Sequence, residues 1–182
     1  MLTEYMFFSF MQVNSFARDV IGLSNVEAVG ALLIVSGMGI PVRPVVGWLG
    51  DNHVGPINVY MISLLGLSAV TFAWTAVKTR AALCIFCVFF GMMIGCAQGI
   101  FVGALASLTK DPQKMGTRYG MVSTLLGFAT LAGPPTGGAI IGQSGGKYVW
   151  AQVWGGFVAL FAAMAIAVAR FNMTGLKIKA RV

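Results

Sequence analysis

The chain has 182 residues, of which 58% are hydrophobic and only 9% are charged, against about 25% charged residues in ordinary soluble domains. Its net charge of +7 comes from basic residues that lie mostly in short loops and near the C-terminus, without the basic stripe and interleaved aromatics of a nucleic-acid-binding surface. This pattern excludes nucleic acid as a partner and is typical of charges that set membrane topology.

Four stretches without any charged residue indicate the class of protein. They cover 26, 29, 28 and 22 residues, over 52–77, 81–109, 119–146 and 148–169. About 20 apolar residues are enough for a helix to cross the hydrocarbon core, and one soluble core of this size cannot bury so much apolar length. The sequence therefore predicts an all-α, multi-pass integral membrane protein whose surroundings are a lipid bilayer.

Six helical segments are expected in chain order, within a single transmembrane domain over 1–182. They cover 2–17 (partial), 26–49, 56–77, 81–108, 119–143 and 149–170, and 171–182 follows as a cytoplasmic tail. The apolar part of the first segment is too short to span a bilayer and does not resemble a signal peptide, so we expect the chain to begin part-way through a helix. An even number of segments places both ends on one side, and seven basic residues against four favour the cytoplasm.

Arg43 is the sharpest feature of the first complete span. It lies eight residues before Asp51, roughly 12 Å inside the expected end of the helix at about 1.5 Å per residue. A guanidinium at that depth is costly unless it faces a cavity, a counter-ion or an anionic solute, and it can hold a carboxylate with two hydrogen bonds. Snorkelling to the headgroups, or pairing with another helix, is the structural alternative. Pro41 and Pro44 predict a kink at this place.

The fourth segment carries four glycines spaced four residues apart, which places them on one helix face: Gly91, Gly95, Gly99 and Gly103. Such a face allows close packing, either static or between helices that slide. Gln98 adjoins this face and is the single amide of the segment, so it is a candidate to line a solute path or to bond to a neighbouring helix.

Two further features are candidates for a hinge and for a polar contact. The fifth segment contains a proline- and glycine-rich stretch, in which a broken hydrogen-bond ladder fits either a hinge or a tight crossing of helices: Gly133, Pro134, Pro135, Gly137 and Gly138. Asn14, in the partial first segment, either lines the path or bonds across helices.

Chemistry-bearing residues are few. The chain has one histidine, five acidic residues and three cysteines, and they form no paired carboxylates, no nucleophile with a base and no metal-ligand cluster. The three cysteines, all within 81–109, are expected to act as small apolar packing residues. We therefore expect no enzyme activity, no cofactor and no metal.

Three stretches resemble the C-terminal half of a major facilitator superfamily carrier, specifically a fungal monocarboxylate-transporter-like protein: "RPVVG" (43–47), "KDPQKMGTRYGM" (110–121) and "GFATLAGPPTGGAIIG" (127–142). "GWLGDNHVG" (47–55) is similar to the superfamily's inter-helix loop motif through Gly47, Leu49 and Asp51, although the basic residues that normally follow are missing. The Arg-Pro pair is the most specific of these matches, and the resemblance covers nearly the whole chain.

The resemblance implies a secondary transporter, of the symporter type, that moves a small anionic organic solute by alternating access. It assigns Arg43 to carboxylate binding and implies a plasma-membrane location. Animal monocarboxylate carriers have an aspartate four residues before this arginine, where the present chain has Gly39, so the aspartate's part in proton coupling does not carry over.

The superfamily uses two six-helix halves, so the expected partner is a missing N-terminal half. Two alternatives stay open at this point. One is a half-carrier that acts as a homodimer with a second copy of the chain. The other is a truncated remnant, or a membrane scaffold held together by its glycine faces, that transports nothing.

Overall fold

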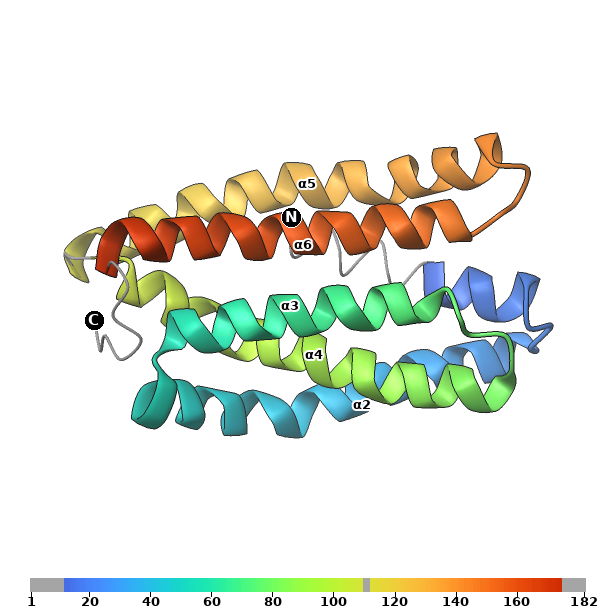
Figure 1. The fold of residues 1–182 in the computed structure, drawn as a ribbon, viewed down its shortest axis with the longest axis horizontal. Coiled ribbons are helices and arrows are strands. Elements are labelled where there is room, and N and C mark those ends of the chain that lie inside the picture. The colour runs from blue at the N-terminus through green and yellow to red at the C-terminus, as the bar shows by residue number, and fades with distance from the viewer. Residues whose placement is uncertain (1–11, 110–111, 175–182) are drawn as a thin grey trace.

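The computed structural model describes residues 12–109 and 112–174, and these form helices joined by short connections (Figure 1). Residues 12–19 are helical and are followed by α2 (Asn25–Leu49), which continues as a π-helical turn over Gly50–Val54, and by α3 (Pro56–Trp74). The remaining elements are α4 (Arg80–Ser107), a 3-10 turn (Pro112–Lys114), α5 (Met115–Gln143) and α6 (Val149–Thr174).

The prediction of an all-α membrane helix bundle is confirmed. Five helices are long and apolar enough to cross a membrane, and none of the described residues lies in a strand. The helix that contains Arg43 reaches further than expected, because the π-helical turn carries it on to Val54. A membrane favours such uninterrupted helices, since each satisfies its backbone groups within its own segment.

Local signals explain where the helices begin and end. At the start of α2, the Ser24 hydroxyl accepts a hydrogen bond from the Glu27 amide, and the Glu27 carboxylate accepts one from the Ser24 amide, which together form a capping box. Thr79 caps α4 in a similar way through the Ala82 amide. At Trp74, three residues earlier than expected, α3 gives way to a tight turn with i to i+3 hydrogen bonds.

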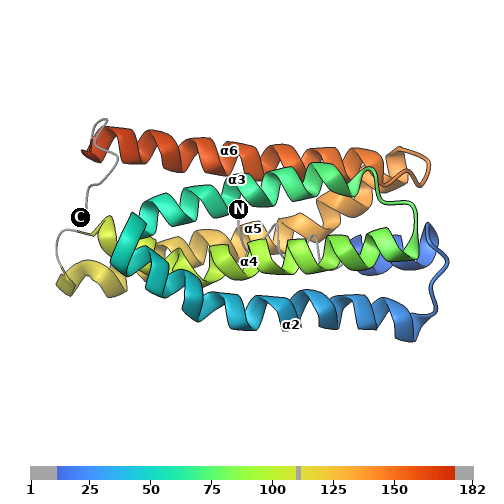
Figure 2. The ribbon, with the colours of Figure 1, turned by 60° about the horizontal axis from the view of Figure 1, so that its bottom comes forward.

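Helices α2, α4, α3 and α6 pack side by side in that order, and α5 contacts α6 (Figure 1). In Figure 2, α5 is seen behind α3 and α4. We call the end at which α2, α4 and α6 begin the Asn25 end, and the opposite end, where α2 finishes, the Leu49 end. Helices α2 and α4 run in the same direction, and α3 runs against both.

Two apolar clusters hold the row together. The one toward the Asn25 end joins Phe16, Trp74, Phe86 and Phe90, and the one toward the Leu49 end joins Tyr60, Leu64 and Ile100 with smaller residues. The rings of Phe16 and Trp74 meet edge to face, with centroids 5.6 Å apart. Helix 12–19 therefore belongs to the packed bundle at the Asn25 end.

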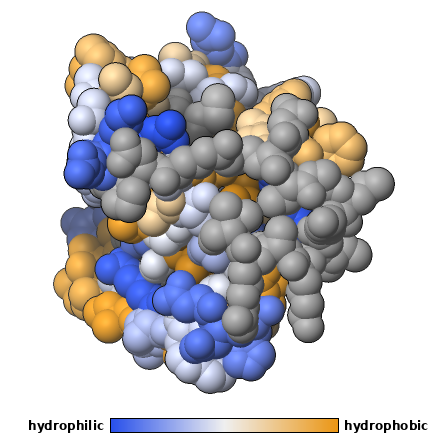
Figure 3. Space-filling model, turned by 90° about the vertical axis from the view of Figure 1, so that its left-hand side faces the viewer, coloured by the Kyte–Doolittle hydropathy of each residue, from blue (hydrophilic) through white to orange (hydrophobic). Residues whose placement is uncertain are grey.

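The outer surface of the bundle is strongly apolar along the helices and polar at the Leu49 end. Leu125, Phe128 and Leu131 on α5 are 70%, 70% and 77% exposed. Figure 3 looks at the Leu49 end, where hydrophilic residues gather on the end face and hydrophobic residues occupy parts of its rim. This distribution matches a bundle whose sides face lipid or another apolar surface and whose ends face water.

Candidate functional site

The site predicted around Arg43 lies on the face of α2 that packs against α4. Val35, Gly39 and Arg43 follow one another at intervals of four residues, and Val35 and Gly39 are buried. Residues four apart on a helix lie above one another on one face, so the backbone at Arg43 is drawn to α4 by the packing of the two turns before it.

The glycine face of α4 permits this contact, and we call the contact the glycine seam. A Cβ atom on Gly91 would lie 2.3 Å from the Val35 carbonyl oxygen, and one on Gly95 would lie 2.7 Å from the Gly39 Cα. A Cβ on Gly99 would lie 2.9 Å from the Arg43 Cα. The fourth glycine of the predicted face, Gly103, is different, because its nearest neighbour would be Pro56 at an ordinary 3.7 Å.

The structure joins two of the predicted site residues directly. The Nη2 group of Arg43 donates a hydrogen bond to Oε1 of Gln98, which lies next to the glycine seam on α4. Arg43 is 18 residues after Asn25 and Gln98 is 18 residues after Arg80, so the two parallel helices carry the pair at the same depth. Gln98 is half-buried, whereas the Arg43 side chain is exposed in the bundle of described residues.

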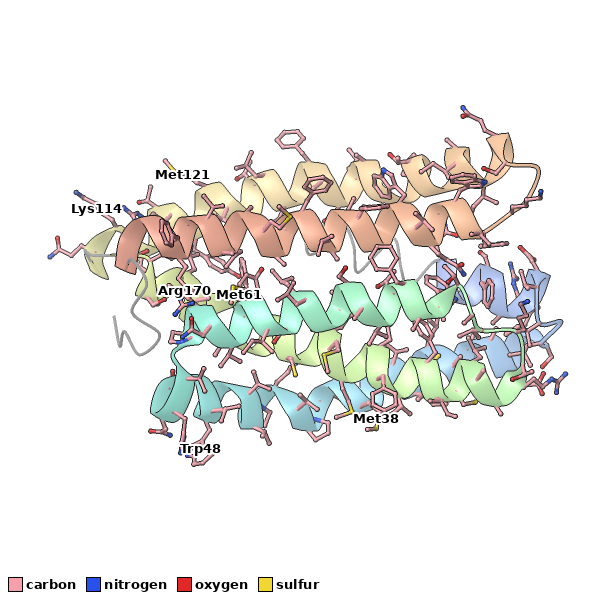
Figure 4. All side chains as sticks on the ribbon, in the orientation of Figure 1. Met38, Trp48, Met61, Lys114, Met121 and Arg170 are labelled. Atoms are coloured by element: carbon pink, nitrogen blue, oxygen red, sulfur yellow. The ribbon has the colours of Figure 1, made fainter. Side chains whose placement is uncertain are left out.

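Arg43 lies well inside the membrane-spanning part of its helix. At about 1.5 Å per residue it is roughly 27 Å from Asn25 and roughly 16 Å from Val54. If the hydrocarbon core is about 30 Å thick and the continuous helix Asn25–Val54 is centred in it, the backbone of Arg43 lies roughly 10 Å inside the nearer boundary. Met38 and Trp48, both labelled on α2 in Figure 4, lie five residues before and after Arg43.

No carboxylate among the described residues forms an ion pair with Arg43. The acidic residues of this part of the chain lie near the ends: Asp19 and Glu27 at the Asn25 end and Asp51 at the Leu49 end. Glu27 pairs instead with Arg80, at 3.2 Å between Oε1 and Nη1. The guanidinium thus has a neutral amide as its hydrogen-bonding partner on α4.

Asn14 is not brought to this pair. It is half-buried on helix 12–19, five residues before Asp19, so it lies toward the Asn25 end, in the region of Phe16 and Tyr148. The structure therefore brings Arg43 and Gln98 together and leaves Asn14 apart from them.

The proline-containing stretches are helical in the structure. Pro41 and Pro44 lie inside α2, and Pro134 and Pro135 lie inside α5, which runs unbroken from Met115 to Gln143. Gly133 and Gly137 are the buried residues of α5, while Gly138 faces open space. In the predicted loop motif, Gly47 and Leu49 belong to α2, and Asp51 belongs to the π-helical turn.

Two polar features of the bundle were missed by reading the sequence. The Tyr148 hydroxyl donates a hydrogen bond to the Asp19 carboxylate, which connects helix 12–19 to the start of α6. Gln152, one turn further along α6, is only 2% exposed. A single amide inside a charge-free run is the signal that could have drawn attention to Gln152, as it did to Gln98.

Three known proteins that resemble the chain are longer than it, and each matches it over only part of its own length. The chain is 31% identical over 168 residues to an MFS-type transporter of Gibberella zeae, covering 91% of this chain and 38% of the relative. It is 33% identical over 119 residues to an aspyridones efflux protein of Emericella nidulans, covering 65% of this chain and 24% of the relative. It is 30% identical over 134 residues to monocarboxylate transporter 4 of Rattus norvegicus, covering 71% and 28%. No family model matches the chain.

A polytopic bundle of apolar helices, together with relatives that are named transporters, places the chain in the class of membrane transporters. The chain belongs to the major facilitator superfamily, within the group that contains fungal MFS-type transporters and monocarboxylate transporter 4. It spans 24–38% of the length of the three relatives described above.

Proposed function

We propose that this chain supplies one six-helix half of a carrier that moves a small anionic organic solute across the membrane by alternating access. The single observation that carries the proposal is the Arg43 guanidinium, which is held deep in the span, exposed, and without a carboxylate partner among the described residues. A charge in that position is retained at a cost unless it serves a solute or its path.

The chemistry of the guanidinium selects the class of solute. Its planar fork of N–H donors matches a carboxylate, to which it can donate two parallel hydrogen bonds. The names of the relatives support an organic solute, since one is a monocarboxylate transporter and another an aspyridones efflux protein. A monocarboxylate, or a larger product that carries an acidic group, is therefore the proposed solute class.

The exposed side of the bundle supports a second helical unit as the partner. Helix α5 buries only Gly133 and Gly137 and leaves long apolar side chains exposed. In the proposed carrier, a second six-helix unit packs against part of this surface, and the solute binds between the two units near the middle of the membrane. We place the carrier in the plasma membrane with the Leu49 end toward the cytoplasm.

Uptake measurements on the complete carrier test the role of Arg43. In proteoliposomes, with radiolabelled short-chain monocarboxylates as probes, we expect Arg43→Ala to lower kcat/KM by about 10- to 100-fold, the loss of one or two charge-assisted hydrogen bonds. Arg43→Lys keeps the positive charge but loses the planar fork of donors, so its kcat/KM should lie between those of the unaltered carrier and Arg43→Ala.

The matched control is Arg80→Ala. It removes the same type of side chain from a solvent-exposed ion pair at the Asn25 end, where such pairs contribute little, and it should leave uptake within about twofold of the unaltered carrier. Equal transport by the Arg43→Ala carrier, at matched protein abundance, removes Arg43 from the binding site and defeats the proposal.

A further inference from the structure

The hydrogen bond between Gln98 and Arg43 is built on a rigid base. The two helices touch through backbone at Gly95 and Gly99, so the Cα atoms at positions 43 and 99 cannot separate without breaking the seam. Gln98 directly precedes Gly99, and its side chain therefore starts from a fixed point beside the base of the arginine side chain. The backbone packing of α2 against α4 thus fixes the position of Gln98 relative to Arg43.

No other side chain of α4 within one turn of Gln98 could accept a strong hydrogen bond from Arg43. A side chain at position 99 would collide with the Arg43 backbone, and the neighbours of Gln98 within one turn are Ile94, Gly95, Cys96, Ala97, Gly99, Ile100, Phe101 and Val102. None of these side chains offers a strong acceptor. Gln98 is accordingly the residue through which α4 can orient the guanidinium.

The chemistry of an amide suits this task better than that of a carboxylate. The Gln98 carbonyl accepts one of the five N–H donors of the guanidinium, and this leaves donors for a carboxylate of a solute. Because the amide is neutral, it restrains a long, flexible side chain without neutralising the charge that attracts an anion. A glutamate at the same position would hold the arginine equally well but would cancel that charge.

We propose that Gln98 is a positioning residue: it aims the Arg43 guanidinium across the seam between α2 and α4 and keeps it charged and available to an anionic solute. This inference rests on the proposed function of Arg43. It assigns Gln98 to the arginine rather than to the solute itself.

Two substitutions of Gln98 test the assignment in the complete carrier. Gln98→Glu has nearly the same shape and should raise KM for a radiolabelled monocarboxylate by more than about 10-fold, because its carboxylate occupies the guanidinium. Gln98→Leu removes the acceptor and should raise KM by about 3- to 10-fold, with kcat within about twofold, because the guanidinium is no longer aimed. Gln143→Glu, the same chemical change at an exposed site at the Asn25 end of α5, should leave KM unchanged.

The order of the KM values of the unaltered carrier, Gln98→Leu and Gln98→Glu distinguishes a positioning role of Gln98 from a simple packing role. If Gln98 only filled space, Gln98→Glu would transport like the unaltered carrier because the two side chains are nearly isosteric. An unchanged KM in either Gln98 variant, measured on protein that elutes as a monodisperse peak at normal abundance, overturns the inference. That result combined with a loss of uptake in Arg43→Ala leaves the proposed function intact, whereas normal uptake in Arg43→Ala removes both.

Discussion

At the scale of single residues, the close packing at the glycine seam limits which side chains α2 can have where it contacts α4. A Cβ at Gly39 would lie 3.3 Å from the Gly91 carbonyl oxygen. A side chain at position 39 would therefore require the neighbouring backbone of α4 to move by a few tenths of an ångström. The glycine at position 39 is therefore part of the same close packing that brings α2 and α4 together at Arg43.

The seam can be tested with one added methyl group. Gly91→Ala places a carbon 2.3 Å from the Val35 carbonyl oxygen, and we expect it to cost about 1–3 kcal/mol, which lowers the apparent melting temperature in detergent by several degrees. Gly103→Ala is the control on the same helix, since its added carbon meets its nearest neighbour at 3.7 Å. It should have no effect or raise the melting temperature slightly, because alanine favours helices. Equal melting temperatures for the two variants would contradict the close contact.

At the scale of the elements, polar contacts between helix termini hold the Asn25 end together. Arg80 of α4 pairs with Glu27 of α2, and Arg18 donates to the Asn25 side chain at 3.2 Å. Tyr148 connects α6 to helix 12–19 through the Asp19 carboxylate, next to the Phe16 ring. The contacts of Arg80 with Glu27 and of Tyr148 with Asp19 join residues that are distant in sequence, so they help to fix how the helix ends are arranged.

The stabilisation from the hydrogen bond between Tyr148 and Asp19 should decrease at alkaline pH. Burial, followed by the hydrogen bond to Asp19, raises the pKa of Tyr148 from 10.0 to about 12. The folded protein favours the protonated hydroxyl, so this stabilisation is complete below about pH 10 and is lost as the pH rises toward 12. We expect the difference in apparent melting temperature between the unaltered protein and Tyr148→Phe to be constant from pH 7 to pH 9 and to shrink above pH 10. A difference that does not change up to pH 11.5 would contradict this stabilisation.

At the scale of the whole molecule, apolar sides and charged ends specify how the bundle sits in a bilayer. Lys114, Arg118 and Arg170 lie toward the Leu49 end, and Figure 4 shows Lys114 and Arg170 there. Arg118 also donates to the Leu108 carbonyl, 3.0 Å away, at the end of α4, where a cation complements the helix dipole. The sequence predicts seven basic residues on this side of the membrane against four on the other.

Labelling from one side of the membrane tests the orientation. In a protein whose Cys84, Cys87 and Cys96 are replaced by alanine, we expect Gln143→Cys, at the Asn25 end, to react with a membrane-impermeant maleimide on intact cells. Gly116→Cys, at the Leu49 end, should react only after permeabilisation, because positively charged ends remain in the cytoplasm. Both positions are exposed, and a Cβ at Gly116 meets no atom within 4 Å. The reverse labelling pattern would place the Leu49 end outside.

Much of the architecture follows from the sequence because it depends on local properties. A charge-free run long enough to span lipid becomes a helix whatever its neighbours are, since the bilayer leaves backbone groups no other partner, and this is why the all-α membrane bundle could be predicted. Helix ends were less predictable where they depend on geometry, as at the π-helical turn after Leu49 and the tight turn after Trp74.

The sequence by itself determined that Arg43 stands inside a span and needs a partner, because the cost of an isolated charge in lipid does not depend on the fold. Only the tertiary structure decided that the partner is Gln98, 55 residues away, and that Asn14 lies toward the other end of the bundle. Both outcomes depend on which helix faces meet, and that was set by the distance at which the glycine seam lets α2 and α4 approach.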